Sequence, residues 1–408
     1  MFDSDKWIEI FATMAKNPLR TFLTGLSVSL GVFILVVLQG LGFGLQNGVM
    51  SEFDDEAINS LWIRSGRTSK PYGGFQSNRR IQYKENDLNF ILETYPEADL
   101  YSGRYGFWGA PITFRGETQN FAVRSVHPGH KDLERTKLTD GRYINELDLQ
   151  HERKVCVIGQ QIIDDLFKGI DPIDKYLKIY GIPFRIIGTY DDPASRWENR
   201  VVYLPISTGQ KVFGGGDNLD MFILTTGTKA LEQTVEMREK IEKLLRERHK
   251  VHPEDERAIR VRNVNEDLKE FLDIFKGIKV FIWVMGILTL IAGMIGVANI
   301  MSVVVKERTK EFGIRKAIGA SPWSIVSMIL QEAVLLTLVS GCLGFLFGIG
   351  ALNLISTFVE HDYFKNPRID VAVSVGVIVV LMFIGAVAGL FPSIRASRIK
   401  PITALRED

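Results

Sequence analysis

Uncharged and charged stretches are strongly segregated along this chain, with the apolar stretches near its two ends. Four windows stay uncharged for about 20 residues or more, the length that a helix needs to cross a bilayer. They are 21–51, 280–305, 333–359 and 371–394. One such helix could belong to a soluble core, but four that are flanked by charge predict membrane spans. We therefore expect one transmembrane helix, a large polar insertion and three further transmembrane helices.

The polar insertion combines strand and helix signals. Short runs rich in β-branched and aromatic residues predict strands, whereas the apolar spacing of 85–94, 160–167 and 229–248 predicts helices. The strand-like runs are 60–64, 111–115, 154–158, 176–180, 184–190, 201–204 and 221–225. This alternation predicts an α+β domain that contains at least one βαβ-type unit and is divided into two lobes.

Amphipathic segments flank the predicted spans. Apolar residues of 3–16 recur at helical spacing until Asn17-Pro18, which predicts an interfacial helix on the inner leaflet. Two further stripes predict a helical stalk between the insertion and the membrane. They consist of Leu45, Val49 and Phe53, and of Val264, Leu268, Phe271, Leu272 and Phe275. The functional interpretation of this stalk is rigid transmission of motion, and the alternative is simple mutual packing.

The basic residues predict the orientation, because cytoplasmic segments of membrane proteins are enriched in Lys and Arg. They cluster before the first window, between the second and third, and after the fourth. We therefore expect a multi-pass protein of the inner (plasma) membrane with both termini in the cytoplasm. The predicted parts are a cytoplasmic interfacial helix (1–17), a first span (18–45), an extracytoplasmic α+β domain with stalk helices (46–275), a second span (276–305), a cytoplasmic coupling loop (306–321), a third span (322–359), a fourth span (370–394) and a cytoplasmic tail (395–408).

Composition mainly excludes functions. The formal net charge of +1 gives no general attraction to nucleic acid, and the two cysteines, Cys156 and Cys342, are expected to stay unpaired. The sequence contains no G-x-x-x-x-G-K-[ST] phosphate loop, so we expect a non-catalytic chain that does not hydrolyse ATP. The segment from His127 to His130 is expected to be a surface loop; a metal site is the alternative, but no zinc-type spacing completes it.

The segment between the second and third windows is short, dense in charge and bounded by rigid elements. Its basic residues help to fix the membrane topology, but its acidic residues, Glu307 and Glu311, are not needed for that purpose. Ser321 and Pro322 suit the N-cap and first position of the third span. The carboxylate of Glu332 is expected to pair with basic residues of this loop, and a proton relay is the alternative.

Glycines recur at four-residue spacing in the predicted spans, where they let another helix approach closely. The pairs are Gly40 and Gly44, Gly344 and Gly348, and Gly385 and Gly389. Packing within one subunit and packing between two subunits are both compatible with this pattern.

Several segments of the sequence resemble the MacB/FtsX family of ABC transporter permeases. The resemblance is carried by 294–301 and 305–320 near the second span, by 16–21 and 392–405 near the ends, and by 141–143 and 155–159 in the insertion. Asp174 stands where the family usually has glycine. The resemblance covers the whole chain and its order of one span, a large external domain and three spans.

The resemblance implies a second permease copy, as a homodimer or heterodimer, and a separate ABC ATPase subunit that binds ATP and Mg²⁺. No cofactor and no metal are then expected in this chain. The residues expected to form the ATPase-coupling element are Glu307, Arg308, Thr309, Glu311, Gly313, Arg315 and Lys316. Closure of the ATPase would move these residues, and the stalk would relay the motion outward, a process called mechanotransmission.

The expected function is that of a permease subunit of a MacB-like transporter, for export or extraction of a peptide, drug, lipid or lipoprotein. A periplasmic adaptor and an outer-membrane duct are further expected partners, and the lipoprotein-releasing permeases of the LolC/LolE type are similar in mechanism. The alternative is an FtsX-type mechanotransmitter that regulates cell-wall hydrolases, although external domains of that type are generally smaller.

Overall fold

The computed structural model describes residues 18–54, 57–192, 195–227, 230–358 and 371–401. The predicted interfacial helix at 1–17 and residues 402–408 of the predicted tail lie outside them. The chain forms two compact units. One comprises Met1–Val49 and Ile274–Asp408, and the other comprises Met50–Asp273. The first is called here the membrane unit and the second the external unit.

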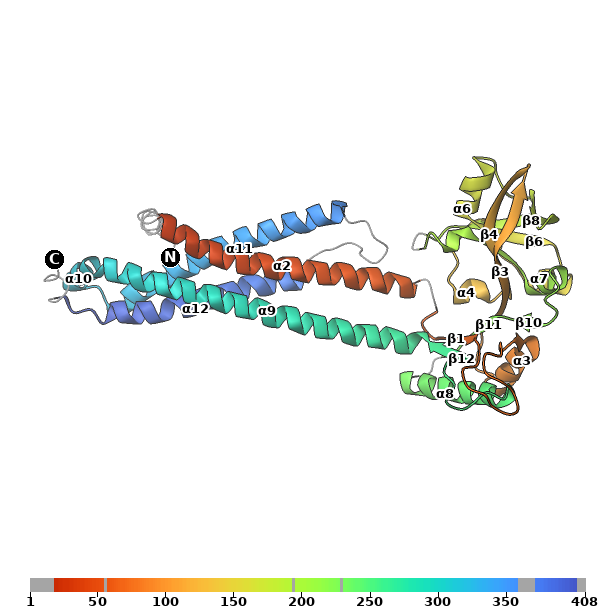
Figure 1. The fold of residues 1–408 in the computed structure, drawn as a ribbon. Helices are drawn as coiled ribbons and strands as arrows, with labels where there is room; N and C mark the ends of the chain where they lie inside the picture. The colour runs from red at the N-terminus through yellow and green to blue at the C-terminus, as the bar shows by residue number, and fades with distance from the viewer. Residues whose placement is uncertain (1–17, 55–56, 193–194, 228–229, 359–370, 402–408) are drawn as a thin grey trace. The chain divides into compact units, whose positions relative to one another are not determined.

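Four long apolar helices build the membrane unit (Figure 1). They are α2 (Pro18–Asp54), α9 (Val264–Glu307), α11 (Pro322–Phe358) and α12 (Val371–Ser397), and a short helix, α10 (Thr309–Ala317), lies between α9 and α11. Among the described residues, these four are long and apolar enough to cross a membrane. The predicted order of one span, a β-rich insertion and three spans is therefore confirmed.

The membrane helices pack through a shared cluster of buried apolar residues. Val32 of α2, Val297 of α9 and Ala333 of α11 are fully buried in one shared cluster. Other large apolar side chains point outward, such as Phe347 of α11 and Phe383 of α12, each more than 60% exposed. Outward-facing apolar side chains on these helices are compatible with a lipid environment, since the bilayer interior is as apolar as they are.

A ten-stranded mixed sheet forms the external unit, with the order β12-β1-β11-β3-β4-β9-β6-β8-β5 and with β7 pairing to both β3 and β8. Its strands are β1 (Ser60–Ser65), β3 (Tyr101–Phe114), β4 (Glu117–Val126), β5 (Leu138–Gly141), β6 (Val155–Gly159), β7 (Tyr176–Ile179), β8 (Ile182–Tyr190), β9 (Val201–Pro205), β11 (Met221–Thr225) and β12 (Ile259–Asn263). A separate pair joins β2 (Tyr83–Lys84) to β10 (Asn218–Leu219).

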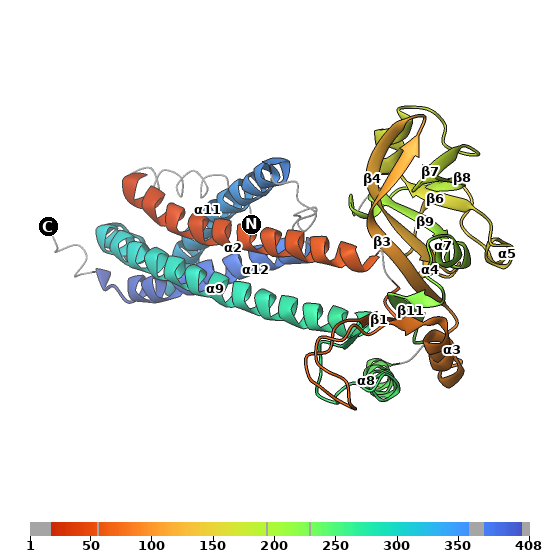
Figure 2. The ribbon, with the colours of Figure 1, turned by 45° about the vertical axis from the view of Figure 1, so that its right-hand side comes forward.

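Helices connect these strands and cover parts of the sheet (Figure 2). They are α3 (Glu85–Thr94), α4 (His130–Leu133), α5 (Glu146–Gln150), α6 (Gln160–Ile162), the π-turn η1 (Ile163–Phe167), the 3₁₀ turn η2 (Glu198–Arg200), α7 (Ile206–Val212) and α8 (Leu231–Arg248). Strand β6 pairs in parallel with β8, and α6, η1 and β7 lie between them along the chain. The predicted βαβ-type unit is therefore confirmed.

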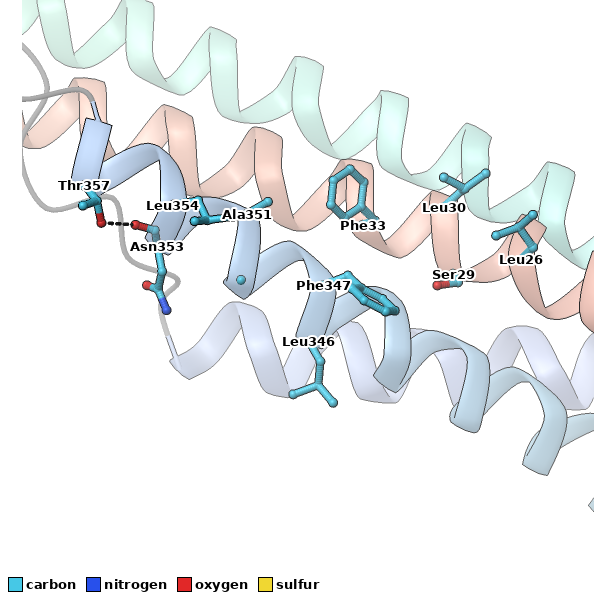
Figure 3. A pocket seen from close by; sticks show the side chains of 11 residues that line it. Leu26, Ser29, Leu30, Phe33, Leu346, Phe347, Ala351, Asn353, Leu354 and Thr357 are labelled. Atoms are coloured by element: carbon cyan, nitrogen blue, oxygen red, sulfur yellow. Dashed lines mark hydrogen bonds between the residues drawn. The ribbon is translucent and has the colours of Figure 1, made fainter.

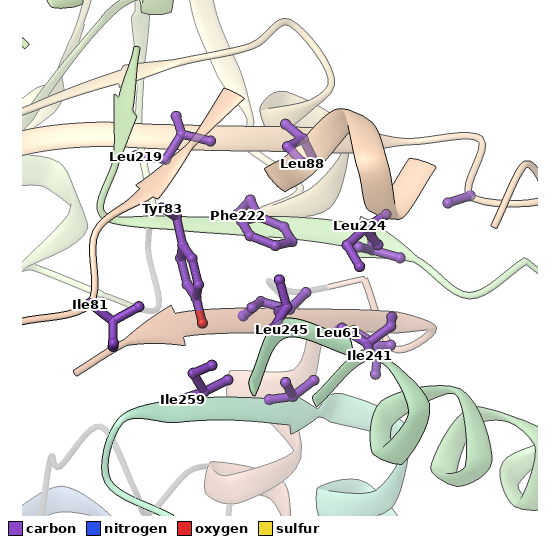
Figure 4. Close-up of a cluster of buried hydrophobic side chains, with 14 of the residues drawn as sticks. Leu61, Ile81, Tyr83, Leu88, Leu219, Phe222, Leu224, Ile241, Leu245 and Ile259 are labelled. Atoms are coloured by element: carbon purple, nitrogen blue, oxygen red, sulfur yellow. The ribbon is translucent and has the colours of Figure 1, made fainter. Parts of the chain in front are cut away.

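Three groups of buried side chains lie in the described part of the external unit, one in a first lobe and two in a second lobe. In the first lobe, strands β1, β11 and β12 pack against α3 and α8 through Leu61, Phe222, Leu88 and Ile241 (Figure 4). In the second lobe, strands of the other half of the sheet enclose residues such as Phe184 and Val202. The long strand β3 pairs with β11 at one end and with β4 along its length, so it belongs to both lobes.

The two predicted stalk stripes are only partly buried. Phe53, Val264 and Phe275 have at most 5% of their surface exposed, but Leu45 and Phe271 are about 40% exposed. The rings of Phe53 and Phe271 meet edge to face with centroids 5.7 Å apart. Both stripes lie on helices, within α2 and α9, and whether they transmit motion rigidly or only pack together stays a prediction.

Both cysteines are free, as predicted: Cys156 is buried in β6, and Cys342 lies exposed on α11. Burial of Cys156 raises the pKa of its thiol, because the thiolate would be desolvated there. It therefore behaves as an apolar core residue rather than as a nucleophile.

Candidate coupling site

The segment 306–321 contains a helix rather than the predicted short loop. Helix α9 ends at Glu307, and α10 occupies Thr309–Ala317 with Glu311 in its first turn and two basic residues in its last turn. This placement of charge favours a helix, because it complements the helix dipole. Gly319 follows with φ of +105°, a left-handed conformation that favours glycine and ends the helix.

Helix α10 is anchored by an apolar cluster at the end of the membrane unit. Phe312 is fully buried there among Val305 of α9, Ile325 and Ile329 of α11, and Ala396 of α12. A ring of this size contributes roughly 3–5 kcal/mol when it fills a site fully. Phe312 of α10 therefore shares one buried cluster with residues of three membrane-unit helices.

A charged network reinforces this anchor on its polar side. Arg308 donates two hydrogen bonds to Glu311, at 2.8 and 2.7 Å, and a third of 3.2 Å to Glu332 of α11. The side chain of Glu332 is only 5% exposed. The prediction that Glu332 pairs with a basic residue of the connecting segment is confirmed. A buried carboxylate of this kind needs such a partner.

The other end of α10 is tied to the end of α12. Lys316 donates hydrogen bonds of 2.7 and 2.9 Å to the carbonyl oxygens of Ser397 and Ile399. These oxygens lie where α12 ends and carry the negative end of its dipole, so a lysine is favoured there. Arg315 adds a contact of 3.1 Å to Glu311. Both ends of α10 are thus held to neighbouring helices.

The opposite face of α10 is open and partly apolar. Lys310 and Ile314 lie four residues apart on one face of α10, and Ile318, the C-cap residue, follows Ile314 at the same spacing. All three are exposed; Ile314 has 44% of its surface exposed and Ile318 83%. We call these three residues the coupling face. Nearby, Trp323 at the start of α11 is 73% exposed.

The seven residues expected to form the coupling element are divided between these two sides. Glu307 is exposed, whereas Gly313 is buried and the other five, Arg308, Thr309, Glu311, Arg315 and Lys316, are half-buried. The hydroxyl of Thr309 donates back to the carbonyl of Lys306 at 2.8 Å. Five of the seven thus make contacts within the chain that hold α10 in place. Their contact with a partner stays a prediction.

Ile314 and Ile318 are not among the residues that the sequence predicts for the coupling element. The signal was present, because two isoleucines four residues apart in a charged segment lie on one helix face. This spacing predicts a shared face only if the segment is a helix, and the sequence predicted a loop there.

The paired glycines lie at close approaches within the membrane unit. A Cβ atom on Gly344 would meet the backbone oxygen of Ser29, and one on Gly348 would meet the side chain of Val36. Gly385 faces Thr337, Gly389 faces Ala333, and Gly40 faces Leu352. Gly44 is buried. These contacts place small residues between α2 and α11 and between α11 and α12.

An apolar cavity of about 800 Å³ opens beside the contact of α2 with α11 (Figure 3). Leu26, Leu30 and Phe33 line it from α2, and Phe347 and Leu354 from α11. Its polar groups are few; Thr357 already donates a hydrogen bond of 2.9 Å to the carbonyl of Asn353. The lining suits acyl chains or apolar side chains.

The segment from His127 to His130 is not the exposed surface loop that was predicted. His130 begins α4 and is fully buried, with its Nε2 3.0 Å from a carboxylate oxygen of Glu134. His127 is also largely buried, and its Nδ1 accepts a hydrogen bond of 2.9 Å from the amide of Gly103. Among the described residues, no group of three His, Cys, Asp or Glu side chains could hold a metal ion.

Two family models match the chain, one over most of α2 and of the external unit and the other over the C-terminal helices. The MacB-like periplasmic core domain matches residues 21–243, and the FtsX-like permease C-terminal domain matches residues 283–401. The chain belongs to the MacB/FtsX-like permease family. Its described residues include four helices long and apolar enough to span a membrane, and membership of this family makes it a multi-pass protein of the inner membrane.

Named relatives of this MacB/FtsX-like permease agree with that assignment. It is 29% identical over 405 residues to the macrolide export ATP-binding/permease protein MacB of Chlorobaculum tepidum, an alignment that covers 98% of the chain and 61% of the relative. It is 25% identical over 407 residues to the uncharacterized ABC transporter permease YvrN of Bacillus subtilis, covering 97% and 98%. The chain therefore spans about three fifths of the length of that MacB relative.

A solved structure is similar to part of the chain. The periplasmic region of MacB from Actinobacillus actinomycetemcomitans aligns with 55% of this chain and 97% of its own length, with 19% identity and a TM-score of 0.44.

Proposed function

We propose that this chain is the permease subunit of a MacB-like ABC transporter that is driven by a separate ATPase subunit. The observation that carries the proposal is α10, a helix with an exposed coupling face on one side and anchors to α9, α11 and α12 on the other. A partner that pushes on this face would move the adjoining ends of α9, α11 and α12 as one body. Phe312, Arg308 and Lys316 hold α10 to these helices.

The direction of the push follows from the proposed topology, with α10 and both termini in the cytoplasm. Helix α9 extends without interruption from Val264 to Glu307. It is the element that would carry the motion to the external unit, where a peptide, drug, lipid or lipoprotein would be exported or extracted. A second permease copy, and in a cell with two membranes an adaptor and an outer-membrane duct, would complete the assembly.

The relatives support a division of labour between subunits. The MacB relative is named as an ATP-binding and permease protein, and this chain matches about three fifths of it. The YvrN relative is named as a permease and matches over almost its whole length. We propose that ATP and Mg²⁺ bind to a separate ATPase subunit, and the permease name of the YvrN relative supports this proposal.

The FtsX-type alternative, regulation of cell-wall hydrolases, shares the same coupling element. The FtsX-like match covers residues 283–401, the membrane part that both classes need, so it favours neither. The MacB-like match to residues 21–243 includes most of the external unit, which favours export or extraction.

Two substitutions on the coupling face test the proposal. We expect Ile314→Glu and Ile318→Glu to abolish co-purification with the ATPase and its stimulated turnover, because each places a charge in an apolar contact. Leu147→Glu is the matched control, since Leu147 is 51% exposed on α5 of the external unit. Unchanged ATPase binding and turnover in both isoleucine variants would reject the assigned role of α10.

A further inference from the structure

A pocket in the external unit is lined by an unusual number of arginines. Its volume is about 320 Å³, which is in the range of small-molecule sites. Arg64, Arg80, Arg104 and Arg124 all line it, and among the lining residues Asp220 is the one carboxylate. The pocket wall is therefore strongly cationic.

Strand register explains why residues so far apart in sequence converge here. Arg64 of β1 lies opposite Met221 of β11, and Met221 lies opposite Arg104 of β3. Arg124 of β4 lies opposite Gly106, two residues further along β3. Residues directly opposite each other share a face of the sheet, so these arginines project from the same face.

The arginines differ in how fully their charge is compensated. Arg124 makes a bidentate pair with Glu198, at 2.6 and 3.0 Å, and Arg80 donates to Asp220 at 3.2 Å. Arg104 lies 3.5 Å from Glu134 and donates no side-chain hydrogen bond to any other residue within the described part of the chain. Its side chain is only 15% exposed. Arg104 is thus a largely desolvated cation with a single loose partner.

Electrostatics agree with this description of Arg104. Burial lowers the pKa of its guanidinium, and the neighbouring charge of Arg124 lowers it further. A lowered pKa means that the protein disfavours this positive charge. An anion in the pocket would relieve the repulsion and supply the missing hydrogen-bond acceptors.

Aromatic rings stand at the edge of the same pocket. Trp108 lines it and stacks on Trp197, with ring centroids 5.3 Å apart and an interplanar angle of 17°. Both side chains are more than half exposed, which is unusual for tryptophan. The guanidinium of Arg124 lies 5.7 Å from the ring centre of Trp108. A flat apolar group could stack here while its charged end reaches Arg104.

We propose that this pocket binds a small amphipathic organic anion, with a carboxylate or phosphate group at Arg104 and a flat apolar ring against Trp108. The proposal goes beyond the proposed transport function, because binding can be measured without any ATPase. Its failure would leave the coupling site untouched, and failure of the coupling site would leave this pocket untouched.

Isothermal titration calorimetry on the full chain in detergent tests the proposal, with empty micelles as the blank. The probes are 1-naphthoate and 1-naphthyl phosphate, which carry the two candidate anionic groups, and neutral 1-naphthol. We expect saturable binding of at least one anion and at least about tenfold weaker binding of 1-naphthol. That ratio corresponds to the loss of one charge-assisted hydrogen bond.

Three variants locate the site. Arg104→Gln should weaken binding of the anion by about tenfold or more, and Trp108→Ala, at an exposed position, should weaken it without affecting folding. Arg185→Gln is the matched control, because it removes a partly exposed arginine paired with Asp174 at 3.7 Å, away from the pocket. Absence of saturable binding to the wild-type chain, equal affinity for 1-naphthol, or unchanged affinity in both pocket variants would overturn the proposal.

Discussion

The pair of Arg308 and Glu332 gives the sharpest energetic prediction for the anchor of α10. Glu332 is 5% exposed and Arg308 13% exposed, and their side chains are 3.2 Å apart. Replacing Arg308 by Gln withdraws the guanidinium from a carboxylate that is almost fully buried. Such a loss destabilises a protein by about 3–5 kcal/mol, because a buried charge is left uncompensated.

Replacing the other partner of the pair should reduce the stability of the chain much less. Glu332→Gln removes the buried charge and keeps an oxygen that can accept from Arg308, which also retains its two hydrogen bonds to Glu311. We expect a loss of about 1 kcal/mol, the net contribution of an ordinary hydrogen bond. The double variant Arg308→Gln/Glu332→Gln should then be more stable than Arg308→Gln alone.

Unfolding of the purified chain in mixed micelles, followed by tryptophan fluorescence, provides the free energies for this double-mutant cycle. The asymmetry between the two single variants is the decisive feature. If Glu332→Gln destabilises the chain as much as Arg308→Gln does, or if the two effects simply add, the buried ion pair does not hold α10 to α11 as described.

Three further predictions concern other parts of the chain. Gly344→Ala should destabilise the membrane unit by about 1–3 kcal/mol in the same unfolding assay, because its Cβ would meet the backbone of Ser29, whereas Gly350→Ala, with open space around it, should not. Lys316→Met should reduce ATPase stimulation while leaving ATPase binding intact, because it releases the end of α12 but not the coupling face. Burial lowers the pKa of His127 to about 4, from an ordinary value of 6.5. The folded chain therefore keeps this ring neutral while the unfolded chain takes up a proton, so stability falls as the pH drops from 6.5 towards 4. His127→Asn should show a smaller drop in melting temperature between pH 7 and 4.5 than the wild-type chain.

Much of the fold was predictable because membrane spans have a strong local signal. The absence of charge over 280–305 and 333–359 is enough to predict two helices, whatever they pack against. Strand signals such as 154–158 and the helical spacing of 85–94 are also local, and β6 and α3 lie at these positions. What these signals do not contain is the order of strands in the sheet, which depends on contacts between distant residues.

The candidate sites were less predictable for the same reason. The density of charge in 306–321 predicts a loop, and in a loop the four-residue spacing of Ile314 and Ile318 would not place them on one face. His127 and His130 were expected in a surface loop because nothing near them in sequence completes a metal site, but His130 is fully buried and the side chain of His127 is only 15% exposed. The arginine pocket combines β1, β3 and β4, so no local pattern could indicate it.

A photo-crosslinking residue placed at position 314 tests the central claim most directly. With a crosslinker there, the account predicts an ultraviolet-dependent product between this chain and an ABC ATPase subunit, identified by mass spectrometry and its yield changed by ATP. The same crosslinker at position 147 in the external unit should give no such product. A crosslink to the ATPase from position 147, or none from position 314 in an active complex, would contradict the account.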